Sequence, residues 1–129
     1  MEITSYILAA IAAYLLGSIP TGYLVARARG IDIRSVGSGN IGATKVFRIL
    51  GKSAGIFVLL VDFLKGFLAC WMVARIAGQF FESTPSQKDY LALTSGLAAI
   101  LGHNYTCWLK FKGGKGIATS AGVLAALFP

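Results

Sequence analysis

The sequence predicts an all-α integral membrane protein, a polytopic bundle of transmembrane helices, from its composition and the arrangement of its apolar residues. Hydrophobic residues make up 56% of the 129 positions and charged residues only 13%, against about 25% charged residues in average chains. The mean hydropathy is +0.71. Apolar residues gather in blocks of spanning length instead of alternating with polar ones, so a membrane environment explains the composition better than a soluble core.

Three apolar blocks are long enough to cross a membrane. They cover residues 3–26, 54–74 and 90–109, and about 20 residues are needed to cross hydrocarbon about 30 Å thick. No basic residue precedes the first block, which favours a retained helix, bent at Pro20, over a cleaved signal peptide. The fourth block starts at residue 117 and is too short to span, so we expect one membrane domain over 1–129 that is cut off inside a helix.

The charges of the connecting loops predict how the helices are oriented. The loop 27–53 holds six basic residues against one acid, and the loop 110–116 holds three lysines and no acid, whereas the segment 75–89 is neutral. By the positive-inside rule the two basic loops are cytoplasmic and the N-terminus lies outside. Nucleic acid binding is set aside, because the cations lie in short loops and do not form a basic face with interleaved aromatics.

The first basic loop is dense in glycine and small polar side chains. Residues 37–42 match G-x-G-x-x-G, but a dinucleotide fingerprint needs a strand before it and a crossover helix after it, and neither is predicted here. The hydroxyls of Ser38 and Thr44, the amide of Asn40 and the cation of Arg48 suit an oxyanion or a phosphate. The alternative is a flexible loop in which Ser38 caps the helix that follows.

The second basic loop places lysines among glycines at the start of an apolar segment. The stretch 111–119 reads FKGGKGIAT. Glycines let backbone N–H groups approach an anion, Lys112 and Lys115 add positive charge, and a helix starting at Ile117 would aim its N-terminus at the same point. We therefore predict a phosphate-binding loop at the membrane surface.

A few reactive side chains lie inside the apolar blocks. Asp62 and Lys65 are three residues apart and share a helix face, so they form either a structural pair or a substrate contact. His103 is the only histidine and has no metal-ligand partner, which leaves a general base or a satisfied interfacial residue. Cys70 and Cys107 are expected to be small buried hydrophobes.

Taken together, three motifs carry a resemblance to one family. GSGNIGAT is followed by Arg48, DFLKG covers 62–66, and GHNYTCWLKFKGGKGIAT covers 102–119. In this order and spacing they resemble the bacterial acyl-phosphate:glycerol-3-phosphate acyltransferases, the PlsY family of integral membrane enzymes. The resemblance implies transfer of a fatty acyl group from acyl phosphate to the sn-1 hydroxyl of glycerol 3-phosphate. The product, lysophosphatidate, enters phospholipid biosynthesis at the bacterial inner membrane.

The resemblance also implies which residues act. It needs no cofactor or metal, and the enzyme that makes acyl phosphate is a partner to consider beside the membrane lipid. Catalytic groups fall on Ser38, Arg48 and Lys115. The expected substrate-binding residues come from the two basic loops, together with two ionisable residues of the apolar blocks. They are Gly39, Asn40, Gly42, Thr44, Lys65, His103, Lys112, Gly113, Gly114 and Gly116.

Two positions and one motif differ from the family pattern. Lys45 stands where asparagine is usual, and Thr106 where proline is common. The family's C-terminal motif with histidine, asparagine and glutamate is not contained in these residues. No Ser-His-Asp arrangement is present, so direct acyl transfer without an acyl-enzyme is expected. The alternatives are an inactive fragment of the enzyme and a transporter subunit for anions or lipid headgroups, although no internal repeat supports transport.

Overall fold

The computed structural model describes residues 2–33, 43–80, 84–110, 113 and 116–128. The predicted all-α architecture is confirmed, since the part of the chain that is described contains helices and no strand. In chain order the elements are α1 (Glu2–Gly17), α2 (Thr21–Ala28), α3 (Ala43–Leu50), α4 (Lys52–Leu68), the π-helical turn η2 (Ala69–Val73), α5 (Ala74–Phe80), α6 (Pro85–Asn104), the 3₁₀ turn η3 (Cys107–Leu109) and α7 (Ile117–Leu127).

Two helical stretches in the described ranges are long and apolar enough to cross a membrane. One runs from Ile3 to Ala28 over 26 residues, and the other from Lys52 to Phe80 over 29 residues. The second joins α4, η2 and α5 into one rod, because the π-helical turn continues the helix without breaking it. The apolar helix α7 is shorter.

The first stretch is interrupted at Pro20. Helix α1 ends at Gly17, where the N–H of Ser18 still donates to the carbonyl of Tyr14 at 2.8 Å. Helix α2 then begins at Thr21, directly after the proline. Proline has no N–H to continue the ladder, so the bend predicted at Pro20 is a break between two helices.

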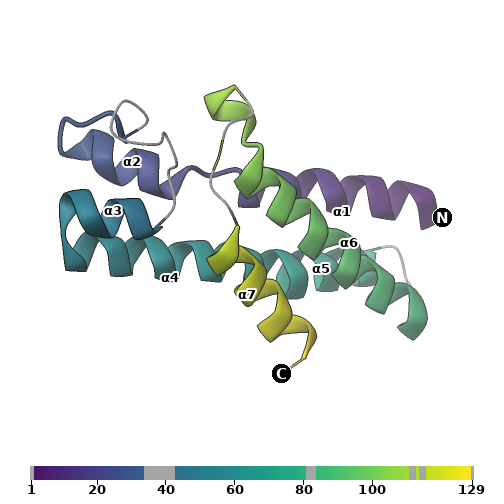
Figure 1. The fold of residues 1–129 in the computed structure, drawn as a ribbon. Helices are drawn as coiled ribbons and strands as arrows, with labels where there is room; N and C mark the ends of the chain where they lie inside the picture. Colours follow the sequence, from purple (N-terminus) through teal and green to yellow (C-terminus); the bar gives the residue numbers. More distant parts are fainter. Residues whose placement is uncertain (1, 34–42, 81–83, 111–112, 114–115, 129) are drawn as a thin grey trace.

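Pairs of glycines let the helices pack closely (Figure 1). A Cβ on Gly17 of α1 would overlap the backbone of α6, and a Cβ on Gly102 of α6 would overlap the backbone of α1. The same reciprocal relation joins α4 and α7 through Gly66 and Gly122. Small residues at helix contacts are typical of membrane bundles, where backbone approach and van der Waals packing drive association.

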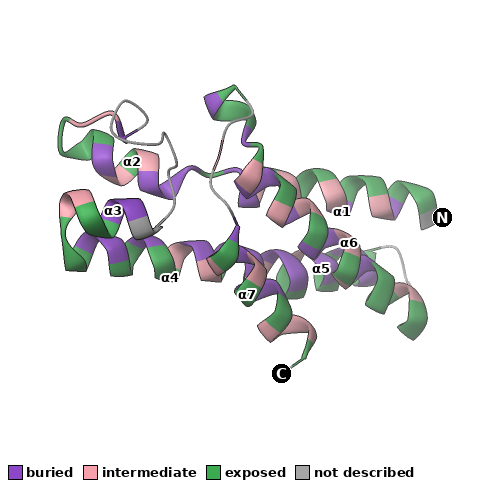
Figure 2. Cartoon of the chain, viewed as in Figure 1, coloured by how far each residue is buried: buried purple, intermediate pink, exposed green. Residues whose placement is uncertain are grey.

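Many residues on the outer faces of the helices are exposed (Figure 2), and large apolar residues are among them. Large apolar side chains face outward along the helices, with Leu60 56% exposed and Phe80 78% exposed. The buried set includes alanines and charged residues such as Asp62 and Lys65. Such an arrangement fits an apolar solvent around the bundle, with the charged residues kept inside it.

The ends of α6 differ from the predicted block 90–109. The helix starts at Pro85 because Thr84 forms a capping box with Gln87, whose side chain accepts from the N–H of Thr84 at 2.8 Å. The helix ends at Asn104. The remaining predicted residues form a turn and η3, and there Cys107 is exposed, so its predicted burial is wrong. Cys70 is buried as predicted.

Candidate active site

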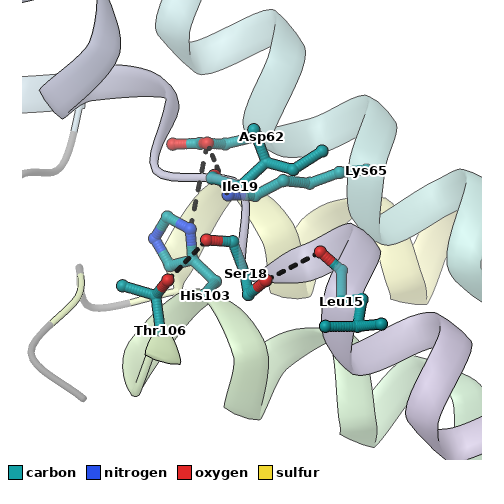
Figure 3. Close-up of polar contacts among 7 residues, drawn as sticks. All are labelled: Leu15, Ser18, Ile19, Asp62, Lys65, His103 and Thr106. Atoms are coloured by element: carbon teal, nitrogen blue, oxygen red, sulfur yellow. Dashed lines mark hydrogen bonds and ion pairs between the residues drawn. The ribbon is translucent and has the colours of Figure 1, made fainter. Parts of the chain in front are cut away.

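Three ionisable side chains meet in the interior of the bundle (Figure 3). Asp62 and Lys65 come from α4 and His103 from α6, and none of the three is more than 7% exposed. The Lys65 Nζ lies 3.1 Å from the Asp62 Oδ1, as an ion pair without hydrogen-bond alignment. The His103 Nδ1 lies 3.8 Å from the same oxygen. We call these three residues the buried cluster.

The buried cluster is tied to the break after α1. The Lys65 Nζ donates to the backbone carbonyl of Ile19 at 2.8 Å. That carbonyl lies between α1 and α2, in the segment that Pro20 holds outside regular helix. The ammonium of Lys65 therefore has two partners inside the protein, which favours a structural pair with Asp62 over a substrate contact.

Two glycines of the second basic loop, Gly113 and Gly116, lie on the C-terminal end of α6. The N–H of Gly113 donates to the carbonyl of Asn104 at 2.8 Å, and a Cβ on Gly113 would overlap the carbonyl of His103. Gly116 has a φ of 81°, and a Cβ there would lie 2.5 Å from the Asn104 Oδ1. Only glycine allows this approach. The two described glycines of the loop thus pack on the last residues of α6, and Gly113 meets the backbone of His103.

A hydrogen-bond network joins the turn after α6 to the same break after α1. The Thr106 hydroxyl donates to the carbonyl of Ser18 at 2.5 Å, and the Trp108 Nε1 donates to the Ser18 hydroxyl at 3.1 Å. The Tyr14 hydroxyl donates to the carbonyl of Tyr105 at 2.5 Å. Thr106 therefore has a specific structural role here. The network fixes the residues that lead into the glycine-rich loop.

The first basic loop leads into α3, where two cations are described. Lys45 is 2% exposed, and within the described ranges its ammonium makes no hydrogen bond. Arg48 lies in the last turn of α3 and is exposed. A buried ammonium without a partner is costly unless an anion lies beside it. Lys45 thus marks a place that favours an anion.

Most other predicted site residues lie outside the described residues. These are Ser38, Gly39, Asn40, Gly42, Lys112, Gly114 and Lys115. Thr44 lies in α3, but its side chain is not described. Of the predicted site, the structure brings together Lys65, His103, Gly113 and Gly116, and it places Arg48 on α3. Across the described ranges, no group of three or more His, Cys, Asp or Glu residues is placed to hold a metal ion.

Sequence reasoning missed the contact between Asp62 and His103, which are 41 positions apart. Gly66 lies four residues after Asp62, and Gly102 directly precedes His103. Both glycines lie at close contacts between helices. A glycine beside an intramembrane charge is a signal for a helix contact, but it does not say which helix is the partner.

Comparisons with known proteins give the family. The family model for glycerol-3-phosphate acyltransferase matches residues 7–129. The glycerol-3-phosphate acyltransferase of Geobacter metallireducens is 53% identical over 117 residues, which cover 91% of this chain and 56% of the relative. That of Geotalea daltonii is 48% identical over 126 residues, which cover 98% of this chain and 60% of the relative.

Two solved structures agree with this result. The crystal structure of PlsY, an integral membrane glycerol 3-phosphate acyltransferase, in its glycerol 3-phosphate form has a TM-score of 0.80 and 46% identity, and the match covers 97% of this chain and 58% of that one. The lysophosphatidic acid form has a TM-score of 0.77 and 44% identity. The chain spans about three fifths of the length of the relatives it matches. On these grounds the chain belongs to the glycerol-3-phosphate acyltransferase family of helical integral membrane proteins.

Proposed function

We propose that the chain serves the transfer of a fatty acyl group from acyl phosphate to the sn-1 hydroxyl of glycerol 3-phosphate, which gives lysophosphatidate and phosphate. The observation that carries the proposal is the likeness, over 97% of this chain, to the crystal structure of a family member in its glycerol 3-phosphate form. Membership of the family over residues 7–129 supports the same reaction.

The glycine-rich loop on the end of α6 is the proposed site for the phosphate of glycerol 3-phosphate. Gly113 and Gly116 pack against α6 without side chains, and α7 begins directly after Gly116. The first N–H groups of a helix are free to donate, and the helix dipole favours a negative charge at that end. Lys112 and Lys115 are proposed to supply the neutralising cations, and Lys115 would also act on the leaving phosphate.

The first basic loop is proposed to hold the second phosphate, that of the acyl donor. Ser38 and Arg48 are the proposed catalytic groups, with Gly39, Asn40, Gly42 and Thr44 lining the site. Arg48 is exposed at the end of α3, so its guanidinium is free to meet a ligand. The buried ammonium of Lys45 supports an anion near the start of the same helix.

The reaction is proposed to be a direct transfer. The sn-1 oxygen attacks the acyl carbonyl carbon, the bond from that carbon to the phosphate oxygen breaks, and the departing phosphate takes the proton of the hydroxyl. Acyl phosphate is a mixed anhydride with a good leaving group, so orientation and charge neutralisation supply most of what the step needs. Lys65 and His103 are proposed to act indirectly, by holding the loop in place.

Both loops are proposed to face the cytoplasm at the bacterial inner membrane, with the N-terminus outside. Figure 1 shows α2 and α3 at the end of the bundle remote from the N-terminus, and these two helices carry Arg27, Lys45 and Arg48. The acyl-phosphate-producing enzyme is a proposed partner, since it would deliver a reactive substrate to this surface.

The test is an acyl transfer assay in vesicles with palmitoyl phosphate and radiolabelled glycerol 3-phosphate. It compares the chain, a version extended with the C-terminal part of the Geobacter metallireducens relative, and the Ser38→Ala form of each. The extended version is expected to give lysophosphatidate, and Ser38→Ala is expected to abolish it. Palmitoyl-CoA is expected to be inert. A folded, extended protein that yields no product would overturn the proposal.

A further inference from the structure

A pocket lies at the end of the bundle remote from the glycine-rich loop, among η2, α5, α6 and α7. Its volume is about 340 Å³. The small side chains of Ala74, Ala92 and Ala126 line it and are buried or half-buried. Arg75, Gln79 and Lys88 also line it and are exposed, so the polar groups stand at its opening. Arg75 follows Lys65 by ten residues on one helical rod, which is about 15 Å along the axis.

The guanidinium of Arg75 is held in place by an aromatic side chain. Its central carbon lies 5.7 Å from the centre of the Trp71 ring, and Trp71 stacks in turn on Phe67 with the ring centres 6.4 Å apart. A cation over the face of tryptophan is attracted by the ring. Tryptophan is also enriched where a helix meets the lipid headgroups. The Arg75 guanidinium is therefore pre-positioned on a side chain of the type that favours the headgroup region.

The second cation, Lys88, comes from the first turn of α6. Its aliphatic stem lies across Gly78 of α5, where an added Cβ would be 3.1 Å from the Lys88 Cγ. A cation near a helix N-terminus is disfavoured by the helix dipole, so Lys88 does not stabilise α6. A binding role explains both its position and the glycine that makes room for its stem.

The inner part of the pocket is built around an irregular helix turn. The π-helical turn η2 contributes Cys70 and Trp71 to the lining. The Cys70 thiol donates to the carbonyl of Ala92 at 3.3 Å, which ties η2 to α6. Single π-helical turns inside longer helices occur frequently at functional sites.

From these features we propose that the pocket binds the phosphate headgroup of an anionic phospholipid. Among the residues that the structure describes, its lining carries the two cations Arg75 and Lys88 and no acid. Charge complementarity therefore selects an anion, and arginine and lysine both bind phosphate oxygens. The occupant is a lipid and not a free anion, because the outer surface next to the cations is apolar, with Met72 38% and Ile76 59% exposed. Acyl chains can lie along that surface.

The experiment is native mass spectrometry of the detergent-purified protein with phosphatidylglycerol or phosphatidylcholine. The protein is expected to retain the anionic lipid preferentially. Arg75→Gln/Lys88→Gln is expected to lower that preference at least about five-fold. The control Arg27→Gln/Lys52→Gln removes the same charge from exposed residues at the other end of the bundle and is expected to leave the preference unchanged. Thermal denaturation of each variant verifies folding.

A third variant separates geometry from charge. Gly78→Ala keeps every charge but displaces the Lys88 stem, so it is expected to lower the preference about two-fold. If both double variants lost the preference for the anionic lipid equally, the preference would depend only on the total charge of the protein, and the proposal would be overturned. Displacement of the lipid by excess inorganic phosphate would assign the pocket to a free anion and overturn it as well. A third result would also overturn the proposal: the protein forms a dimer without lipid, and only the Arg75→Gln/Lys88→Gln variant fails to form it. Such a dimer would mean that a second copy of the chain occupies the pocket.

Discussion

The Lys65 Nζ donates to the backbone carbonyl of Ile19 at 2.8 Å while it pairs with Asp62 at 3.1 Å. One side chain thereby joins α4 to the break between α1 and α2 and neutralises a buried carboxylate. His103 of α6 approaches the same carboxylate at 3.8 Å. Gly113 and Gly116 rest on the end of α6, so the position of these two glycines depends on the helix that carries His103.

Removing one partner of the buried pair is expected to be strongly destabilising. Lys65→Met leaves Asp62 buried without a counter-charge, which costs about 3–5 kcal/mol. Thermal denaturation in detergent measures the loss. The double variant Asp62→Asn/Lys65→Met is expected to recover much of it, because no uncompensated charge remains. The exposed control Lys52→Met is expected to behave as wild type, and an equal melting temperature for Lys65→Met would refute a structural role for the pair.

Gly113→Ala is expected to displace the glycine-rich loop from α6. The new methyl group would overlap the carbonyl of His103, so the affinity for glycerol 3-phosphate is expected to fall at least about ten-fold, which is about 1.4 kcal/mol. Titration with labelled ligand measures it. Gly30→Ala is the control for the same change where no neighbour lies near an added Cβ. Equal effects of the two substitutions would contradict a specific role for the contact between Gly113 and α6.

Thr106→Val is expected to loosen the turn that leads into the loop. It removes the hydroxyl that bonds the carbonyl of Ser18 and leaves a buried acceptor unpaired, at about 1–3 kcal/mol. Chemical denaturation of the detergent-solubilised protein measures the change. Thr106→Ser keeps the hydroxyl and is expected to retain most of the stability. Equal losses of stability in Thr106→Ser and Thr106→Val would show that the Thr106 hydroxyl does not stabilise the turn.

Lys45→Met is expected to separate stability from substrate affinity. The Lys45 ammonium is buried with no hydrogen-bond partner in the described ranges, so its removal is expected to leave stability unchanged or raise it. The KM for acyl phosphate is expected to rise about ten-fold or more if Lys45 meets the donor phosphate. Parallel melting curves and assays of the extended protein provide both readouts. A less stable variant with an unchanged KM would assign Lys45 a structural role.

Chemical labelling of the two cysteines tests the proposed orientation of the bundle in the membrane. Cys107 is exposed in η3 and Cys70 is buried, so a membrane-impermeant maleimide is expected to label only Cys107. Inverted vesicles, which expose the cytoplasmic face, are expected to be labelled, whereas sealed right-side-out cells are not. Cys107→Ser is expected to abolish the signal. Labelling from the outside alone would reverse the orientation.

The fold was predictable to a large extent because composition and block length are properties of the sequence itself. The apolar blocks at 3–26 and 54–74 correspond to the two long helical stretches of the structure. The start of α6 was missed because the capping box of Thr84 and Gln87 lies ahead of the apolar block that begins at residue 90. The burial of Cys107 was predicted wrongly because the helix ends before it.

The candidate site was predictable in its residue types but not in its contacts. Glycines and lysines indicate phosphate binding wherever they lie in the fold, because the chemistry belongs to the residues. The contact of His103 with Asp62 and that of Lys65 with Ile19 depend on how helices far apart in the sequence pack. A single sequence does not contain that information. Thr106 is a further example, since its role depends on the position of Ser18.

Binding of glycerol 3-phosphate to the chain, measured by titration with labelled ligand, tests the central claim most directly, because it does not require catalysis. We expect saturable binding of glycerol 3-phosphate. Lys115→Gln is expected to lower the affinity at least about ten-fold, whereas Lys88→Gln, at the other end of the bundle, is expected to leave the affinity unchanged. Retention of full affinity by a folded Lys115→Gln variant, or equal weakening by both substitutions, would contradict a phosphate site at the glycine-rich loop.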